Sequence, residues 1–212
     1  MDVTRGPPGC QEQIKKRLNH MPWLYDIPKQ REHAEEWQRE WQRKLSALES
    51  ITFAGDDTFI ANDNVNVFAE RGRDIIVKNK CRIAAGVYLH GPIELGECVG
   101  INKNCCLEGG TVGIQIGRDT RIGSNTHMYA FNHGFNDENG DSIPILAQPI
   151  TSKGIRIGED VWIGANVSIV DGISIAYHAV IGIGSVVTRD VDAFDIVAGN
   201  PATKIGERKR KS

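Results

Sequence analysis

The sequence predicts an all-β solenoid, and three observations carry this prediction. The chain of 212 residues contains 40 Ile and Val residues against 8 Leu, and β-branched residues favour strands over helices. Glycine, with 23 residues, is well above its usual share of about 7%, which indicates many tight turns. From residue 53 onward the sequence repeats with a period of six residues, and from Val77 the recurring position is aliphatic or Met. Neither an alternating strand nor an amphipathic helix has this period, whereas a coil with flat faces, each made of a short strand and a turn, does.

The six-residue period runs through fifteen positions, and all of them are aliphatic or Met: Val77, Ile83, Leu89, Leu95, Ile101, Leu107, Ile116, Ile122, Met128, Ile157, Ile163, Ile169, Ile175, Ile181 and Val187. Three extra residues follow the sixth position, and a long insertion follows the ninth. We expect the aliphatic side chains to point inward. A small residue such as Gly117 or Gly164 often comes next, where we expect successive coils to pack closely. Three hexads per coil give roughly six coils of a triangular prism.

The same register extends backward toward the N-terminus. It passes through Val65, Phe59 and Phe53 and breaks once, at Arg71. The sequence thus predicts a β-helix over residues 51–198, with a protruding loop at 129–154. A C-terminal cap and basic tail would occupy residues 199–212.

Residues 1–50 lack the period and are expected to form an N-terminal helical segment. Gln11–Asn19 predicts a short helix, and Pro28–Ser50 predicts one amphipathic helix. Trp37 and Trp41 lie on its apolar stripe. Such a stripe is typical of a helix docked on a core, although the two indole rings could instead form a ligand platform.

Composition excludes several classes of function. A formal net charge of -2 gives no general electrostatic basis for binding nucleic acid or an anionic membrane surface. No apolar run approaches the ~20 residues of a membrane helix, and the first residues do not have a secretory signal pattern. The five cysteines, Cys10, Cys81, Cys98, Cys105 and Cys106, form no C-x-x-C pair. We therefore expect reduced thiols in a cytoplasmic protein.

Two segments of the repeat resemble a known family. Ile157–Gly164 (IGEDVWIG) and Ile181–Val187 (IGIGSVV) are similar to the hexapeptide-repeat acyltransferases. The resemblance covers about residues 53–205 and implies a left-handed parallel β-helix. It also implies a homotrimer with active sites between subunits, and acetyl-CoA as co-substrate without a metal.

The stretch Ile114–His133 resembles galactoside and maltose acetyltransferases, in which a loop after an inward hexad carries the catalytic histidine. By this resemblance His133 is the general base. The chemistry needs such a group, because an acceptor hydroxyl or amine must lose a proton as it attacks the thioester, and an imidazole suits that task near neutral pH. A solvent-facing loop histidine is the alternative interpretation.

Two other histidines compete with this assignment. His127 precedes an inward position and is expected in a regular coil. His90, in a His-Gly-Pro turn, is similar to one metal ligand of the trimeric zinc carbonic anhydrases of this fold. The spacing of His127 and His133 departs from that family's other two ligands, so no metal site is predicted.

The resemblance also implies binding residues, carried over by position. Ala165, Ile183, Thr188 and Arg189 would line the coenzyme A groove. The segment 197–202 (VAGNPA) matches the family's chain reversal after the last coil, and Lys204 and Arg208 follow it as candidate phosphate ligands. Asn102 matches an acceptor-site residue of sugar acetyltransferases, with a turn asparagine as the alternative.

The sequence therefore predicts a coenzyme A-dependent acyltransferase that moves an acetyl group to a hydroxyl or amine of a sugar-like molecule. No nucleic acid or membrane partner is expected. The cysteines supply no evident nucleophile, so a direct transfer in a ternary complex is expected. A zinc lyase of the carbonic anhydrase type and a non-catalytic solenoid scaffold are the rivals. Stoichiometric zinc in the purified protein would indicate the zinc lyase. The absence of a thermal shift with coenzyme A would indicate the scaffold.

Overall fold

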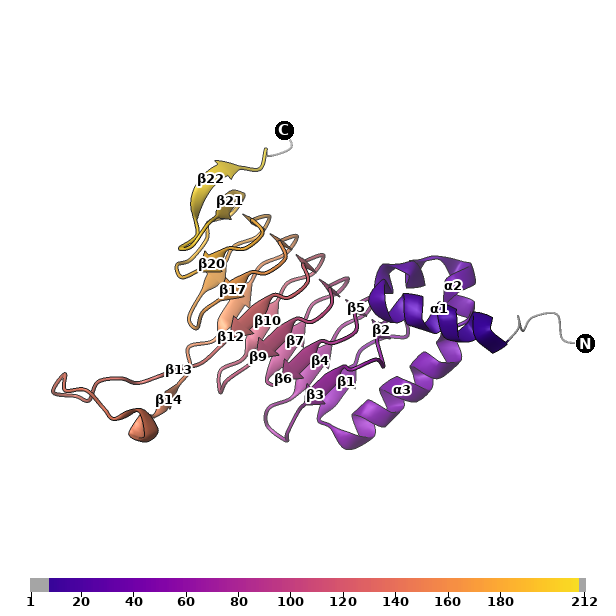
Figure 1. The fold of residues 1–212 in the computed structure, drawn as a ribbon, viewed down its shortest axis with the longest axis horizontal. Coiled ribbons are helices and arrows are strands. Elements are labelled where there is room, and N and C mark those ends of the chain that lie inside the picture. The colour runs from indigo at the N-terminus through magenta and orange to yellow at the C-terminus, as the bar shows by residue number, and fades with distance from the viewer. Residues whose placement is uncertain (1–7, 210–212) are drawn as a thin grey trace, which may run out of the picture.

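The computed structural model describes residues 8–209, and it confirms the parallel β-solenoid (Figure 1). The chain visits three parallel sheets in turn, so that each circuit forms one coil of a prism. Six complete coils and part of a seventh stack along the axis. Equivalent residues pair from coil to coil, as Ile83 does with Ile101.

Three sheets form the faces of the prism. Face 1 contains β1 (Ile51–Phe53), β4 (Ile75–Val77), β7 (Ile93–Leu95), β10 (Ile114–Ile116), β15 (Ile155–Ile157) and β18 (Ser174–Ile175). Face 2 contains β2 (Phe59–Ile60), β5 (Arg82–Ile83), β8 (Gly100–Ile101), β11 (Arg121–Ile122), β16 (Trp162–Ile163), β19 (Val180–Ile181), β21 (Asp195–Ala198) and β22 (Thr203–Glu207). Face 3 contains β3 (Asn66–Phe68), β6 (Tyr88–His90), β9 (Cys106–Glu108), β12 (His127–Tyr129), β17 (Ser168–Ile169) and β20 (Val186–Val187). We call the turns from face 1 to face 2 edge 1, those from face 2 to face 3 edge 2, and those from face 3 back to face 1 edge 3.

The fifteen aliphatic positions of the repeat form the core. Every one of them is buried, and none exposes more than 4% of its surface. Because strands repeat at about 4.8 Å, this places a continuous column of Ile, Val, Leu and Met side chains on the axis. Burial of this column stabilises the solenoid by the hydrophobic effect.

The prism edges explain the small residues that follow the core positions. A Cβ added to Gly117 would lie 2.5 Å from the carbonyl carbon of Gly158 in the next coil. At edge 2 the left-handed backbone conformation recurs at Asn104, Asn125 and Asn166, and Asn tolerates this conformation better than most residues. The turns therefore depend on Gly and Asn at fixed places in the hexad.

The backward extension of the register is only partly correct. Phe53 pairs with Val77 as expected. In the next two strands the inward residues are Ile60 and Val67, which pair with Ile83 and Leu89, so the register slips by one and then by two residues. The first coil departs from strict hexads because Phe59 is buried under the N-terminal helices rather than in the prism.

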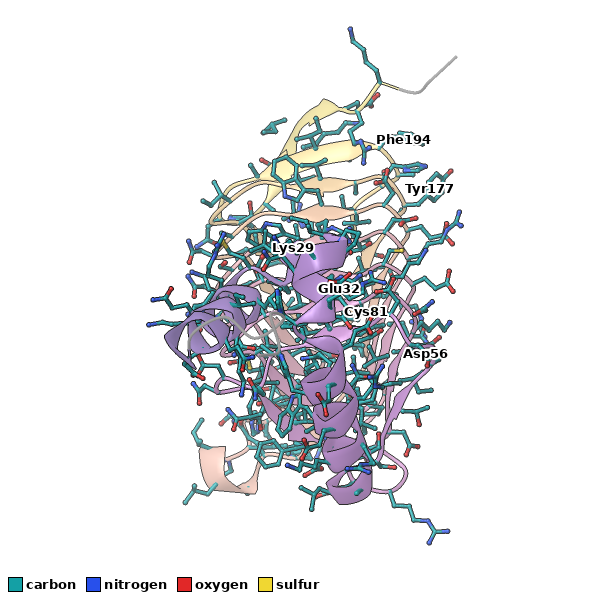
Figure 2. All side chains as sticks on the ribbon, turned by 90° about the vertical axis from the view of Figure 1, so that its right-hand side faces the viewer. Lys29, Glu32, Asp56, Cys81, Tyr177 and Phe194 are labelled. Carbon is teal, nitrogen blue, oxygen red and sulfur yellow. The ribbon has the colours of Figure 1, made fainter. Side chains whose placement is uncertain are left out.

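The N-terminal segment folds into α1 (Pro8–His20), η1 (Pro22–Asp26), α2 (Pro28–Glu32) and α3 (Glu35–Leu48). Figure 2 looks onto these helices, which lie against the first coils. The prediction of one helix over Pro28–Ser50 is wrong, because a turn at His33 and Ala34 separates α2 from α3. Ala34 is fully buried in the apolar cluster beneath the helices, which accounts for the break.

The two tryptophans of α3 dock this helix on the solenoid. Trp37 packs edge-on against Phe59, with ring centroids 5.6 Å apart, and the Trp41 indole nitrogen donates to the Ala61 carbonyl at 3.2 Å. Arg82 adds a polar anchor, since its buried guanidinium binds Asp26 at 2.6 Å and Asp57 at 2.8 Å. These contacts support the helix-on-core interpretation and not the ligand platform.

The chain ends on a strand that runs backward. β22 pairs antiparallel with β21 at the last coil, which reverses the chain after the 197–202 segment. The end of the predicted basic tail, residues 210–212, lies outside the described residues. Within residues 8–209, no helix is both long enough and apolar enough to cross a membrane.

Candidate active site

The long insertion after β12 forms an arm that projects from the prism (Figure 1). Two short antiparallel strands, β13 (Asn132–His133) and β14 (Ile150–Thr151), form its stem, and η2 (Ile145–Ala147) lies toward its tip. Ser152 fixes the base of the arm. Its hydroxyl donates to the Ala130 carbonyl at 2.6 Å and accepts the Val112 amide at 3.1 Å.

His133 lies on the stem, and its side chain is exposed. Its backbone pairs with Ile150, and its amide donates to the Asn132 side-chain oxygen at 2.8 Å. Within the described part of this single chain, no hydrogen bond to the imidazole orients the ring. The group that would fix its tautomer is therefore not supplied by the chain's own arm.

The competing histidines lie on face 3. His127 is half-buried on β12 and stacks on Tyr129, with centroids 6.3 Å apart and planes 7° from parallel. His90 lies two coils away on β6, and its Nδ1 is 3.0 Å from a Glu108 carboxylate oxygen. Among residues 8–209, no group of three His, Cys, Asp or Glu side chains could hold a metal ion.

Three of the predicted binding residues share edge 2. Asn102 follows β8, Ala165 follows β16 and Ile183 follows β19, so they lie in the third, fifth and sixth coils. At about 4.8 Å per coil, Asn102 and Ala165 are roughly 10 Å apart along the axis. Ile183 is 72% exposed, and the nearby Trp162 is 60% exposed. Edge 2 therefore carries an apolar strip, formed by Ala165, Ile183 and the neighbouring Trp162. The polar turn at Asn102 lies on the same edge, two coils before Ala165.

Edge 3 carries a second group. Thr188 and Arg189 follow β20 on this edge, two coils beyond the point where the arm with His133 leaves it. Face 3 separates the two edges. Because the arm projects away from the prism (Figure 1), a single chain does not bring His133 to Asn102, Ala165 and Ile183.

The three candidate phosphate ligands do not converge in one chain. Lys204 lies on β22 and pairs with Asp195 at 2.8 Å and with Glu207. Asp195 and then Glu207 raise the pKa of this ammonium. Arg189 lies on edge 3 and has no ion pair within residues 8–209.

Arg208 reaches edge 1 instead. Its guanidinium donates to the Asp160 carboxylate at 3.0 Å and to the carbonyls of Asp160 and His178 at 3.0 and 3.2 Å. Tyr177 and Phe194 pack together beside this pair (Figure 2). Arg208 thus fastens the end of the chain to two earlier coils.

The thiols of four cysteines, Cys81, Cys98, Cys105 and Cys106, are poor nucleophiles in this fold. Burial raises the pKa of Cys81 to about 11 and that of Cys105 to about 12. Burial also raises the pKa of Cys98 and Cys106, with nearby carboxylates adding to the effect. All four thiols are free and remain protonated near neutral pH.

Comparison with known proteins agrees with this architecture. The family model described as the hexapeptide repeat of succinyl-transferase matches residues 154–189. The B. cereus N-acyltransferase AntD, solved with dTDP and 3-hydroxybutyryl-CoA, superposes with a TM-score of 0.68, at 26% identity, over 80% of this chain and 89% of its own. The chain is thus similar to hexapeptide-repeat acyltransferases, in the repeat over residues 154–189 and in its fold.

Named relatives of this hexapeptide-repeat chain are acetyltransferases. A chloramphenicol acetyltransferase of Klebsiella aerogenes is 54% identical over 24% of this chain and 25% of its own length. WbbJ of Escherichia coli K12, named for O-acetyl transfer in lipopolysaccharide biosynthesis, is 33% identical over 42% of this chain and 47% of its own length. The chain thus spans a quarter to a half of the length of these curated relatives. A Vibrio cholerae hexapeptide-repeat acetyltransferase solved with acetyl-CoA shares the fold, at 22% identity and a TM-score of 0.54 over 95% of this chain and 87% of its own.

Two polar pairs of this hexapeptide-repeat protein were missed from its sequence. His90 pairs with Glu108, and Asp160 pairs with His178 at 2.8 Å. Each pair is separated by 18 residues, which is one coil of three hexads. Searching for His and carboxylate residues 18 apart would have found both.

Proposed function

We propose that this protein is a coenzyme A-dependent acetyltransferase whose acceptor is a hydroxyl or amine of a sugar-like molecule. One observation carries the proposal. AntD aligns with 80% of the chain, and its S84A variant was solved with coenzyme A and an amino-sugar nucleotide, dTDP-4-amino-4,6-dideoxyglucose. The exposed histidine on an arm that interrupts an otherwise regular repeat supports the same function.

The chemistry of edge 2 fits the acyl carrier. The pantetheine arm of coenzyme A is largely apolar with two amides, and the exposed Ile183 and Trp162 side chains, beside Ala165, offer apolar contact along the prism. Thr188, Arg189, Lys204 and Arg208 remain the proposed ligands for the rest of the molecule. Of the three cations, Arg189 is the one with no ion pair to a described residue, so it is the first choice for a phosphate contact.

His133 acts as general base in a direct transfer. Its imidazole takes the proton from the acceptor O–H or N–H as that atom attacks the thioester carbonyl carbon. A backbone N–H stabilises the oxyanion that forms. The carbon–sulfur bond then breaks, the acetyl group remains on the acceptor, and the thiolate of coenzyme A recovers the proton from the imidazolium. The raised pKa values of the described thiols favour this route over an acyl-cysteine.

The proposed site forms between copies of the chain in a homotrimer. His133 leaves the prism at edge 3, while Asn102, the proposed acceptor ligand, lies on edge 2. A cyclic assembly lets the arm of one copy reach edge 2 of the next, and each interface is then equivalent. We place the reaction in the cytoplasm, in keeping with its unpaired thiols.

A screen of acceptors tests the proposed function. Purified protein is incubated with acetyl-CoA and a panel of sugars, amino sugars and amphenicols, and thiol release is followed over time. We expect at least one sugar-like acceptor to accelerate release well above hydrolysis. Absence of release with every acceptor, together with no thermal shift on adding coenzyme A, would contradict the proposal.

A further inference from the structure

The three extra residues that follow Leu107 in the repeat have no part in the proposed mechanism, and the structure places them beside the arm. The turn at edge 3 between β9 and β10 contains five residues, 109–113, whereas the same turn of the preceding coil contains only two. The Gly113 amide closes the longer turn by donating to the Gly109 carbonyl at 2.8 Å. The arm leaves and re-enters the prism at the same edge, one coil later. We call residues 109–113 the arm turn.

One hydroxyl joins the arm turn to both ends of the arm. Ala130 lies where the arm leaves the prism, and Ser152 lies where it returns. The Ser152 hydroxyl donates to the Ala130 carbonyl at 2.6 Å and accepts the amides of Thr111 and Val112 at 3.2 and 3.1 Å. A serine hydroxyl has one hydrogen to donate and two lone pairs that accept. Its whole hydrogen-bonding capacity is therefore used at this point.

The arm turn has the shape that this hydroxyl needs. A Cβ added to Gly110 would lie 2.7 Å from Ser152 Oγ and 2.3 Å from the Ala130 oxygen. Gly110 also has a left-handed φ of 61°, so both the space and the backbone conformation favour glycine here. From two coils earlier, the Arg73 guanidinium donates to the Gly110 carbonyl at 2.8 Å. Arg73 therefore holds the arm turn against the prism, and the arm turn holds the arm through Ser152.

The next coil holds only the returning end of the arm. The Asp171 carboxylate, in the edge 3 turn after β17, accepts the backbone amides of Lys153 and Gly154, each at 2.9 Å. The stem beyond these bonds is short, because β13 and β14 pair over two residues each, and the side chains of both strands are exposed. Since little packing fixes the stem, its direction depends on the hydrogen bonds at its base. Among these, the bonds of Ser152 link the leaving end to the returning end.

We propose that Ser152 is a positioning residue for the acetyl transfer. Its hydroxyl, bound to the arm turn, sets the direction in which the arm presents the His133 imidazole. This inference rests on the proposed function, because it takes His133 as the general base. His133 follows Ala130 by three residues, so a change of angle at the base of the arm displaces the imidazole. A displacement of about 1 Å can lower a rate by about 10²-fold. Ser152 acts on the reaction through His133 alone.

A double-mutant cycle tests this role in the full-length enzyme, with the acceptor that gives the fastest thiol release in the screen. Ser152→Ala removes the hydroxyl, and the fold should survive because water can reach the groups left behind at this half-buried residue. We expect kcat to fall by about 10- to 100-fold with the KM for acetyl-CoA unchanged. In a His133→Ala background the same substitution should have no further effect on kcat. Additive losses would show a merely structural role and would overturn the inference.

Thr120→Val is the matched control. Thr120 is buried at edge 1, where its hydroxyl joins two coils in the same way. It donates to the Gly158 carbonyl at 3.0 Å and accepts the Val161 amide at 3.3 Å. Removing this hydroxyl should lower the stability of the fold and leave kcat unchanged, because edge 1 is remote from the arm.

Hydrogen exchange followed by mass spectrometry separates this inference from the proposed function, because it needs no turnover. In Ser152→Ala, peptides that contain the arm turn and the strands β13 and β14 should exchange faster than in wild type, and Thr120→Val should leave them unchanged. Exchange that Ser152→Ala does not alter, or wild-type kcat in this variant while His133→Ala is slow, overturns the positioning role and leaves the proposed function intact. Near wild-type turnover by His133→Ala overturns the general base, and this inference with it.

Discussion

At the scale of single residues, the proposed chemistry depends on the imidazole of His133. The ring is exposed on the arm, away from the hydrophobic core. Its removal should therefore leave the fold intact. Face 3 holds two further histidines, but His127 is stacked on Tyr129 and His90 is bonded to Glu108.

We expect His133→Ala to lower kcat by about 10²–10⁴-fold, the usual contribution of a positioned general base. The KM for acetyl-CoA should change little, because the imidazole acts on the acceptor proton. Steady-state kinetics with a sugar acceptor measures both constants. His33→Ala is the control, since His33 is exposed at the opposite end of the molecule. Near wild-type turnover by His133→Ala would remove this residue from the mechanism.

The buried thiols lead to a second prediction at this scale. With pKa values of about 11 for Cys81 and about 12 for Cys105, only about one thiol in a thousand and one in ten thousand is ionised at pH 8. We expect both to resist iodoacetamide in the folded protein and to react after unfolding in urea. Mass spectrometry of the digested protein locates the modified residues. Rapid alkylation of Cys105 in the native state would reopen the question of a cysteine nucleophile.

At the scale of elements, the coils depend on glycines at their edges. A Cβ at Gly117 would approach the backbone of the next coil to 2.5 Å, so Gly117→Ala must push two coils apart. We expect a loss of about 1–3 kcal/mol in the free energy of unfolding, as for other overpacked sites. Gly206→Ala is the matched control, because its nearest neighbour would be 3.9 Å away. Urea denaturation compares the two, and equal stabilities would contradict the packing described for the edges.

The end of the chain gives a prediction about pH. A hydrogen bond from His178, followed by the charge of Arg208, lowers the pKa of Asp160 below its ordinary 3.8. A lowered carboxyl pKa stabilises the fold above the unfolded-state value, and this contribution disappears as the pH falls through the folded-state value. We expect Asp160→Asn to be less stable than wild type at pH 6–7, and the difference to shrink below about pH 4. Thermal unfolding across this range measures it, and a difference that does not depend on pH would contradict the pairing.

The elements also show what the sequence could predict. The inward positions were predictable because a six-residue period is a local signal, and all fifteen are buried. The slip of the six-residue register to Ile60 and Val67 in the first coil was not predictable, because the N-terminal helices cover Phe59 from outside the repeat. The break at Ala34 has the same origin, since burial against the first coil is a tertiary effect.

At the scale of the whole molecule, the candidate site could be predicted only as a set of residues. The repeat assigns Asn102, Ala165 and Ile183 to one edge once three hexads make a coil. The direction of the arm and the return of β22, which takes Arg208 to edge 1, depend on segments without a repeat. For that reason the separation of His133 from edge 2 emerges only from the structure.

This separation leads to the proposal of a cyclic trimer. Light scattering should give a mass near three times the 23.4 kDa of one chain. A monomer at concentrations where the enzyme is active would contradict it. The mass alone, however, does not show that two copies share each active site.

Complementation between two inactive variants tests the shared site most directly. His133→Ala removes the base, and Ile183→Asp places a carboxylate on the exposed strip proposed for coenzyme A. The two chains are co-expressed with different tags, and trimers that contain both are purified and assayed. In a cyclic trimer every mixed species has one interface with both groups intact, so we predict about a third of wild-type activity. Mixed trimers as inactive as the parent variants would show that each site lies within one chain.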